Sequence, residues 1–334
     1  MLSLSSHVVV AGAGSIGCFV GGLLAASGRS VSLLARPRVV EEITANGLHL
    51  SDFSGLDMAL APDRLRMATE PDVLRTADLV LVTVKTGATA DIARQIAELA
   101  PRAAVVVSLQ NGVQASALLQ ETLPERDIRP GMVPFNVVPQ GPGHYHRATS
   151  GDILIGAGPT PLPVLSDVPH MAIETVPDIT GVQWGKLLIN LNNALNALSG
   201  QTVQAQLMDR AWRRLMADQM AEGLRVLSAA GLAPVSTTPV PASWVPTILR
   251  LPTALFRRVA AQMLTIDPEA RTSMAYDLRA ARPTEVDALQ GEIIRLGQAH
   301  CVPTPICAAV QARVRAAEAA SETAPALSAA ELRP

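Results

Sequence analysis

A chain of 334 residues, of which 49% are hydrophobic and 17% charged, can bury a full core and is long enough for two domains of ordinary size. This composition excludes a disordered or fibrous protein. The 29 acidic and 27 basic residues nearly cancel, so no strong field would attract nucleic acid or an anionic membrane surface.

The segment from Val8 to Gly28 has no charged residue and imitates a membrane or export segment. No Lys or Arg precedes it, and repeated glycines interrupt it in a pattern that fits nucleotide binding better. The three cysteines, Cys18, Cys301 and Cys307, form no CxxC pair, which suits structural residues in a reducing compartment. We therefore expect a cytoplasmic protein that binds neither nucleic acid nor a membrane.

The first half of the chain alternates short β-branched runs with helical periodicity. Buried strands are predicted at His7–Ala11, Ser30–Leu34, Asp78–Val84 and Ala103–Leu109. Helices are predicted between them, near Ile16–Ser27 and Thr89–Ala100. Such alternation is typical of parallel strands joined by crossover helices. Three further strand-like pieces should close the sheet as antiparallel strands: Val133–Val138, His144–Ala148 and Asp152–Gly156.

From about residue 179 the strand pattern stops, and helices are predicted with interruptions at Gly231–Pro241 and Pro283. The helical ranges are Gly181–Ala197, Val203–Ala230, Trp244–Leu264, Arg271–Ala281 and Glu285–Ala299. The predicted fold class is α/β, with a Rossmann-type dinucleotide-binding domain at 1–177 and an all-helical substrate and catalytic domain at 178–315. The Ala-rich residues 316–334 are expected to form a flexible tail. A Met- and Leu-rich helical face would permit a homodimer, through Leu215, Met216 and Met220.

A glycine-rich turn follows the first strand and opens a helix. It consists of Gly12, Ala13, Gly14, Ser15, Ile16 and Gly17. In this GxGxxG pattern, Gly12 makes the tight turn, Gly14 lets the backbone approach a pyrophosphate, and Gly17 lets the helix pack close to the strand. The strand before the turn and the helix after it favour dinucleotide binding over a purely structural turn.

The end of the second strand distinguishes NAD from NADP. An acidic residue there would bind the ribose 2′-hydroxyl, but the first acidic residue of the chain is Glu41. Arg36 and Arg38 stand there instead, and a guanidinium can hold a 2′-phosphate with two charge-assisted contacts. We therefore predict NADP(H), with Arg36 on the phosphate. Arg38 either assists or is exposed to solvent at a helix start, and simple exposure is also the alternative for Arg36.

Only two of the 27 basic residues are lysines, Lys85 and Lys186. An arginine stays protonated, whereas a partly desolvated lysine can release a proton, so a retained lysine marks a place where arginine does not serve. Lys85 follows one predicted Rossmann strand, and Asn111 follows the next in an Asn-Gly pair that is also an ordinary turn. Lys186, Asn190 and Asn193 share one face of a predicted helix, so they either line a cleft or are paired. Alternatively, Lys186 reaches water and the asparagines cap neighbouring backbone groups.

Hydride delivery to a ketone leaves an alkoxide that needs a proton, and Lys186 is a competent donor. Further along, Pro283 breaks a helix and Thr284 can cap the next one, which leaves Glu285 in its first turn. Beside Lys186, Glu285 would accept a hydrogen bond from the substrate hydroxyl, and Ser273 could donate one to a substrate carboxylate. Helix-start chemistry alone would also explain Glu285.

Together these motifs resemble the ketopantoate reductase (2-dehydropantoate 2-reductase) family, from the glycine turn to about residue 310. The matching pieces are the glycine turn, Lys85, Asn111-Gly112, Trp184–Asn190, Ser273–Asp277 and Thr284–Asp287. The resemblance implies a helical domain like the C-terminal domain of 6-phosphogluconate dehydrogenase. It also implies NADPH-dependent reduction of 2-dehydropantoate to (R)-pantoate, a step of pantothenate biosynthesis.

The resemblance assigns a role to each site residue. It makes Lys186 the catalytic proton donor and has Glu285 and Asn190 orient the substrate. Ser273 binds the substrate carboxylate, and Lys85 and Asn111 lie between cofactor and substrate. It also makes Lys85, Asn111 and Glu285 cofactor contacts.

One position departs from the family pattern. The family often has a second asparagine eight residues after the lysine, where this chain has Ala194. Asn193 could take that role only if the helix or its register shifts, so the enzyme could reduce a different 2-oxo acid. A non-catalytic NADP-binding sensor is a further alternative. His144 and His146 lie on one face of a strand but lack a third ligand, so we expect surface residues and no metal site.

Overall fold

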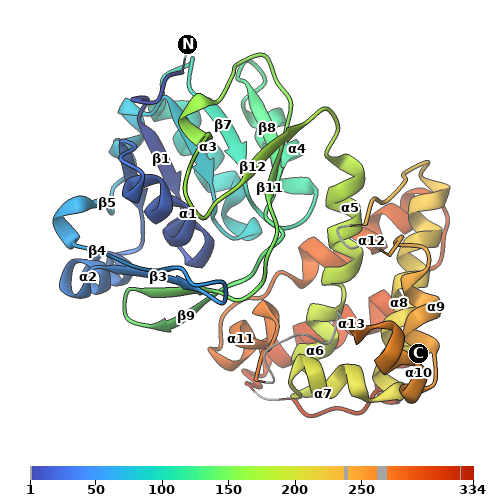
Figure 1. The fold of residues 1–334 in the computed structure, drawn as a ribbon. Helices are drawn as coiled ribbons and strands as arrows, with labels where there is room; N and C mark the ends of the chain where they lie inside the picture. Colours follow the sequence, from blue (N-terminus) through green and yellow to red (C-terminus); the bar gives the residue numbers. More distant parts are fainter. Residues whose placement is uncertain (1, 237–239, 262–268, 324) are drawn as a thin grey trace. The chain divides into compact units, whose positions relative to one another are not determined.

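The computed structural model describes residues 2–236, 240–261, 269–323 and 325–334. The chain forms two compact units, Met1–Ile179 and Thr180–Pro334 (Figure 1). The division lies close to the expected boundary at residue 177. In the described part of the chain, every helix is too short or too polar to cross a membrane.

An eight-stranded sheet with the order β12-β11-β8-β7-β6-β1-β2-β5 forms the centre of the first unit. Its strands are β1 (Val8–Ala11), β2 (Val31–Leu34), β5 (Arg66–Ala68), β6 (Leu79–Val82), β7 (Val105–Ser108), β8 (Ile128–Met132), β11 (Ile153–Gly156) and β12 (Ile173–Val176). The predicted parallel arrangement is confirmed, and β11 joins it antiparallel to β8. Because β1 pairs with both β2 and β6, the strand order reverses beside β1, where ligands of such sheets bind.

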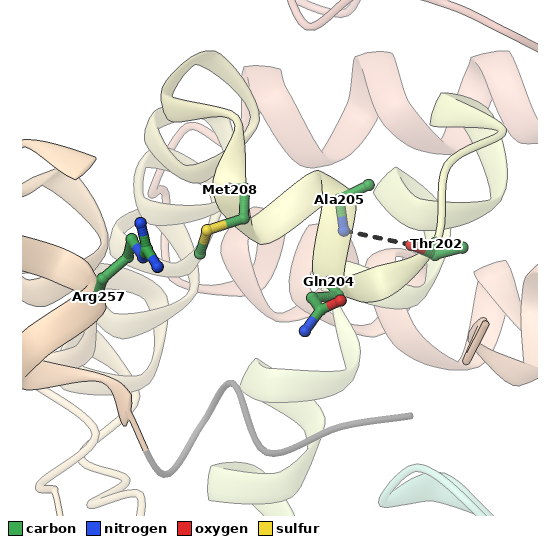
Figure 2. A pocket seen from close by; sticks show the side chains of 5 residues that line it. All are labelled: Thr202, Gln204, Ala205, Met208 and Arg257. Atoms are coloured by element: carbon green, nitrogen blue, oxygen red, sulfur yellow. Dashed lines mark hydrogen bonds between the residues drawn. The ribbon is translucent and has the colours of Figure 1, made fainter. Parts of the chain in front are cut away.

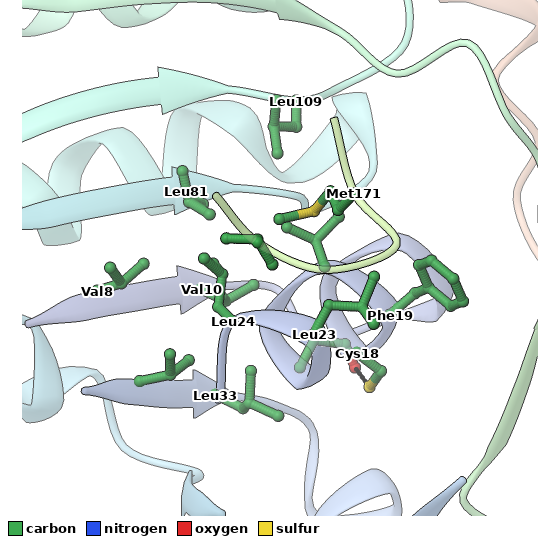
Figure 3. Close-up of a cluster of buried hydrophobic side chains, with 14 of the residues drawn as sticks. Val8, Val10, Cys18, Phe19, Leu23, Leu24, Leu33, Leu81, Leu109 and Met171 are labelled. Atoms are coloured by element: carbon green, nitrogen blue, oxygen red, sulfur yellow. Dashed lines mark hydrogen bonds between the residues drawn. The ribbon is translucent and has the colours of Figure 1, made fainter. Parts of the chain in front are cut away.

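Helices cover both faces of this sheet, which explains why its central strands are continuous apolar runs. The elements are α1 (Ser15–Ala26), α2 (Pro37–Asn46), α3 (Thr89–Leu99) and α4 (Gln114–Thr122), with short 3₁₀ turns η1 (Pro62–Arg64), η2 (Pro71–Thr76), η3 (Thr86–Ala88) and η4 (Pro163–Leu165). Val8 and Val10 of β1 belong to the core to which α1 contributes Phe19 (Figure 3). The intervening Val9 packs in a second core with Ile92 and other residues of α3 and α4.

A second sheet, with the order β4-β3-β10-β9, was not predicted from the sequence. Its strands are β3 (Leu48–Asp52), β4 (Asp57–Leu60), β9 (Val137–Gly141) and β10 (His144–Arg147). The expected strand Val133–Val138 is wrong, because the chain forms β8 before this range and β9 largely after it. Pro134 interrupts that range and has no amide hydrogen for a ladder.

The described residues of the second unit form helices. They are α5 (Thr180–Asn190), α6 (Asn192–Ser199), α7 (Val203–Met208), α8 (Arg210–Ala229), α9 (Val245–Arg250), α10 (Thr253–Val259), α11 (Ser273–Arg279), α12 (Val286–Ala299) and α13 (Pro305–Ala319). Three of the predicted long helices are each split in two. Asp209 starts α8 by accepting a hydrogen bond from the Ala211 amide at 2.8 Å, and Pro252 cannot continue α9. Residues 262–264 of one predicted helix and 237–239 of one predicted interruption lie outside the described residues.

The Met- and Leu-rich face that suggested a homodimer is part of the core. Leu215 and Met220 are fully buried on α8, and Met216 is 6% exposed. Side chains buried inside one chain cannot form an interface with a second copy, so this argument is wrong. The homodimer stays a prediction without that support.

The end of the chain is packed rather than loose. Leu332 and Ala329 are buried, and the Leu327 amide donates to the Leu198 carbonyl at 3.0 Å. Arg333 forms an ion pair of 2.9 Å with Asp218 of α8. The few apolar residues in this segment are thus used for packing, which its Ala-rich composition does not indicate.

Glu222 of α8 stabilises the start of α13. Its buried carboxylate accepts hydrogen bonds from the backbone amides of Ile306 at 2.8 Å and Cys307 at 2.9 Å. In a Glu222→Leu variant both amides lose their acceptor, so we expect the free energy of unfolding to fall by about 2 to 4 kcal/mol. Urea denaturation followed by circular dichroism checks this. The exposed Glu125→Leu is the control, and an equal loss in both variants would contradict the expectation.

Candidate active site

The glycine turn is held against the ends of β2 and β6. The amides of Gly12 and Ala13 both donate to the Leu34 carbonyl, at 3.1 Å and 2.9 Å. Gly12 has a φ of +103°, and a Cβ there would lie 2.6 Å from the backbone nitrogen of Val84. Position 12 therefore requires glycine both for its backbone conformation and for its close contact with the segment after β6.

The other two glycines of the turn have opposite surroundings. A Cβ at Gly17 would lie 2.7 Å from the Gly12 carbonyl and 2.7 Å from the Thr83 hydroxyl, so α1 packs tightly there. At Gly14 the nearest atom to such a Cβ is 4.0 Å away. The backbone at Gly14 is thus open, at the start of α1, which is the space that a pyrophosphate needs. This geometry fits a dinucleotide.

The two arginines after β2 differ in their surroundings. Arg36 stands at the N-cap of α2, is exposed, and has no ion-pair partner among the residues that the structure describes. Arg38 pairs with Glu42 one turn further along α2, at 2.5 Å. Arg38 is therefore engaged within its own helix, whereas the Arg36 guanidinium is directed to no acidic group of the described chain.

Gln110 is a buried residue that the sequence reasoning missed. Its amide nitrogen donates to the Val84 carbonyl at 3.0 Å and to the Thr89 hydroxyl at 2.7 Å. Lys85 follows Val84 directly, and Asn111 follows Gln110. Gln110 thus ties together the segments that carry these two predicted site residues. A polar residue at the end of an apolar strand run is the signal that could have found it.

Lys186 lies on α5 in the second unit and is half-buried. Although its surface is partly accessible, surrounding protein atoms desolvate the ammonium, and this burial lowers the pKa of Lys186 to about 8. The negative charge of Glu285 acts in the opposite direction. An ammonium with this pKa is mostly protonated at neutral pH and gives up its proton more readily than an exposed lysine.

The predicted helix that carries Lys186 is divided into α5 and α6, and Leu191 between them keeps right-handed helical backbone angles, with a φ of −55° and a ψ of −28°. The fully buried Gln290 of α12 donates to the Leu191 carbonyl at 2.8 Å, which ties α12 to the junction between α5 and α6. Lys186, Asn190 and Asn193 are all half-buried, and their common polar face stays a prediction. Asn193 lies on α6, where the next residue, Ala194, is fully buried.

The two predicted residues near the end of the chain lie at helix starts. Ser273 is exposed and begins α11. Glu285 is the N-cap residue of α12, one position before the first turn in which we expected it. The Thr284 hydroxyl accepts from the Val286 amide at 3.3 Å, in the way expected of a capping residue.

His144 and His146 lie on β10 of the second sheet. The hydroxyl of Ser51 on β3 is 2.8 Å from His144 Nε2 and 2.9 Å from His146 Nδ1, and the His49 ring stacks on His144. Both histidines are half-buried, on a strand that pairs with the unpredicted β3 in the same sheet. Across the described ranges, no group of three or more His, Cys, Asp or Glu could hold a metal ion.

A pocket of about 320 Å³ lies elsewhere in the second unit (Figure 2). Its lining residues are Thr202, Gln204, Ala205, Met208 and Arg257. The Thr202 hydroxyl caps α7 by accepting from the Ala205 amide at 3.2 Å, so this polar group serves the local helix start. None of the predicted site residues lines this pocket.

The fold and the glycine turn define the class: a dinucleotide-binding protein with a Rossmann-type unit and a helical second unit. The model of the ketopantoate reductase PanE/ApbA family matches residues 8–160, and the model of the PanE/ApbA C-terminal domain matches residues 178–318. The chain therefore belongs to the ketopantoate reductase family.

Individual relatives extend over nearly the whole chain. A 2-dehydropantoate 2-reductase from Halobacterium salinarum is 29% identical, covering 93% of this chain and 99% of its own length. A crystal structure of a PanE/ApbA family ketopantoate reductase from Ralstonia eutropha superposes with a TM-score of 0.80 at 30% identity, covering 95% of this chain and 99% of its own. D-mandelate dehydrogenase, solved with NADH and anilino(oxo)acetate, has the same fold, with a TM-score of 0.75 at 19% identity and the same coverage.

Proposed function

We propose that the chain reduces 2-dehydropantoate to (R)-pantoate with NADPH. NADPH supplies the hydride that reaches the ketone carbon, and Lys186 donates the proton that the carbonyl oxygen takes up. The observation that carries the proposal is the single desolvated lysine of the second unit, whose lowered pKa of about 8 suits a general acid near neutral pH. Family membership supports the same reaction.

The proposal gives each unit its own task. In the first unit, the turn from Gly12 to Gly17 binds the pyrophosphate, Arg36 binds the 2′-phosphate, and Lys85 and Asn111 contact the nicotinamide side. In the second unit, Glu285 and Asn190 orient the substrate through its hydroxyl, and Ser273 binds its carboxylate. Asn193, which is half-buried like Lys186 and Asn190, joins the substrate contacts.

A second candidate is a reductase of the same build for another 2-oxo acid. It is favoured by Ala194, which stands where the family often has an asparagine and is fully buried here.

We further propose that the protein acts in the cytoplasm, because its three cysteines are unpaired.

Initial rates with a panel of 2-oxo acids, each measured with NADPH and with NADH, test the proposal. We expect the highest kcat/KM with 2-dehydropantoate and NADPH. A kcat/KM for 2-dehydropantoate no better than for its competitors would favour the second candidate. Binding of NADPH without turnover of any 2-oxo acid would instead indicate a non-catalytic sensor.

A further inference from the structure

The position of Ser273 is set by Thr272, the residue before it. The Thr272 amide donates to the side-chain oxygen of Asn196 at 3.0 Å, and the Thr272 hydroxyl donates to the Asn193 carbonyl at 3.1 Å. Thr272 is the N-cap residue of α11, yet its side chain makes no capping bond. Its polar groups hold the start of α11 on α6 instead.

Asn196 is a rigid partner in this contact. It is fully buried, and its amide nitrogen donates to the Gln201 carbonyl at 3.2 Å and to the Gln206 side-chain oxygen at 3.2 Å. A flipped amide would place an oxygen against these two acceptors, so the oxygen of Asn196 must face the Thr272 amide. Asn196 therefore fixes both the distance and the direction of the start of α11.

Comparison with the neighbouring Asn192 distinguishes the contact with Thr272 from a general role in stabilising the fold. It lies one turn earlier on α6, is 8% exposed, and donates to the same oxygen of Gln206 at 3.3 Å. Of the two buried asparagines, Asn196 is the one bonded to Thr272. Both share the network around Gln206, but one of them also reaches the segment that carries Ser273.

We propose that Asn196 is a positioning residue for substrate binding, which places the Ser273 hydroxyl for the substrate carboxylate through the Thr272 amide. This inference rests on the proposed function, because it requires Ser273 to bind that carboxylate. The side-chain bonds of Asn196 run to Gln201, Gln206 and Thr272, so its loss affects the binding of substrate and leaves proton donation intact.

Kinetics of three variants of the full chain test the inference. In Asn196→Leu the amide of Thr272 loses its acceptor, and we expect KM for 2-dehydropantoate to rise about tenfold, with kcat and its pH profile nearly unchanged. In Asn196→Asp an oxygen remains for the Thr272 amide, so KM should stay within about threefold of that of the unaltered protein even though the protein is less stable. The matched control Asn192→Leu should lower the melting temperature and leave KM unchanged.

A double-mutant cycle with Ser273→Ala separates the inference from the function on which it rests. If Asn196 acts through Ser273, Ser273→Ala raises KM and Asn196→Leu adds little to it in that background. If the KM increases of Ser273→Ala and Asn196→Leu multiply in the double variant, the positioning role is overturned. A rise of KM in Asn192→Leu as large as in Asn196→Leu would overturn it as well. In both cases the proposed reductase function is unaffected. A KM unchanged by Ser273→Ala would overturn the role of Ser273 and the inference with it. Absence of turnover in the unaltered protein would overturn the proposed function itself.

Discussion

Replacement of Lys186 by alanine is expected to lower kcat for reduction of the 2-oxo acid by about 100- to 10,000-fold, the range that a positioned general acid contributes. The alkoxide formed by hydride transfer then has to take its proton from water. Because the residues proposed to bind the pyrophosphate and the 2′-phosphate belong to the first unit, the Kd for NADPH should change by less than about threefold. Steady-state kinetics and calorimetric titration with NADPH measure the two quantities separately.

The variant Lys186→Arg separates charge from proton donation. A guanidinium keeps the positive charge but does not release its proton, so we expect a loss of kcat close to that of the alanine variant. Near-normal turnover in Lys186→Arg would show that a fixed charge suffices. An unchanged kcat in Lys186→Ala would remove the catalytic role altogether.

Replacement of Arg36 by alanine is expected to raise KM for NADPH by about 10- to 100-fold and to leave KM for NADH within about twofold. Charge-assisted hydrogen bonds from a guanidinium to a phosphate contribute about 1.5 to 3 kcal/mol to the free energy of binding. NADH lacks the 2′-phosphate, so its binding does not depend on these bonds. Parallel kinetics with the two cofactors give the change of preference directly.

Arg38→Ala is the matched control for this experiment. Arg38 lies two residues further on and is paired with Glu42 on α2, so we expect less than a threefold change with either cofactor. An equal loss with NADPH and NADH in Arg36→Ala would point to damage of the turn rather than loss of a phosphate contact. A larger loss in Arg38→Ala would reverse the assignment of the two arginines.

The central strands of the first unit's large sheet could be predicted well because they are buried on both faces. Continuous apolar runs such as Leu79–Val82 need helices above and below them, and the two cores around β1 provide both. The glycine turn could also be predicted from the sequence, because the crowding at Gly12 and Gly17 excludes any larger residue. Local steric requirements of this kind appear in the sequence itself.

Features that depend on contacts between residues far apart in the chain could not be predicted from the sequence. The second sheet joins β3 to β10, which lies almost a hundred positions further along the chain, and no local pattern announces that pairing. The burial of Leu332 likewise depends on the surface onto which the end of the chain folds. These outcomes follow from tertiary contacts that override local propensity.

The same division holds for the candidate site. Lys186 was found because lysine is rare in this chain, and Ser273 and Glu285 because their motifs are recognisable. The buried amides that support the site, such as Gln110 and Asn196, were missed. A glutamine or asparagine is common in any sequence, and only its burial and its bonding partners show what it holds in place.

The pH dependence of kcat/KM for 2-dehydropantoate tests the central claim most directly, measured with saturating NADPH from about pH 6 to about pH 10. A proton donor must be protonated to act, and burial lowers the pKa of Lys186 to about 8. We therefore expect a plateau below this pH and a fall of about tenfold for each further pH unit. A value of kcat/KM that stays constant well above pH 8, or the same decline in the residual activity of Lys186→Ala, would contradict proton donation by Lys186.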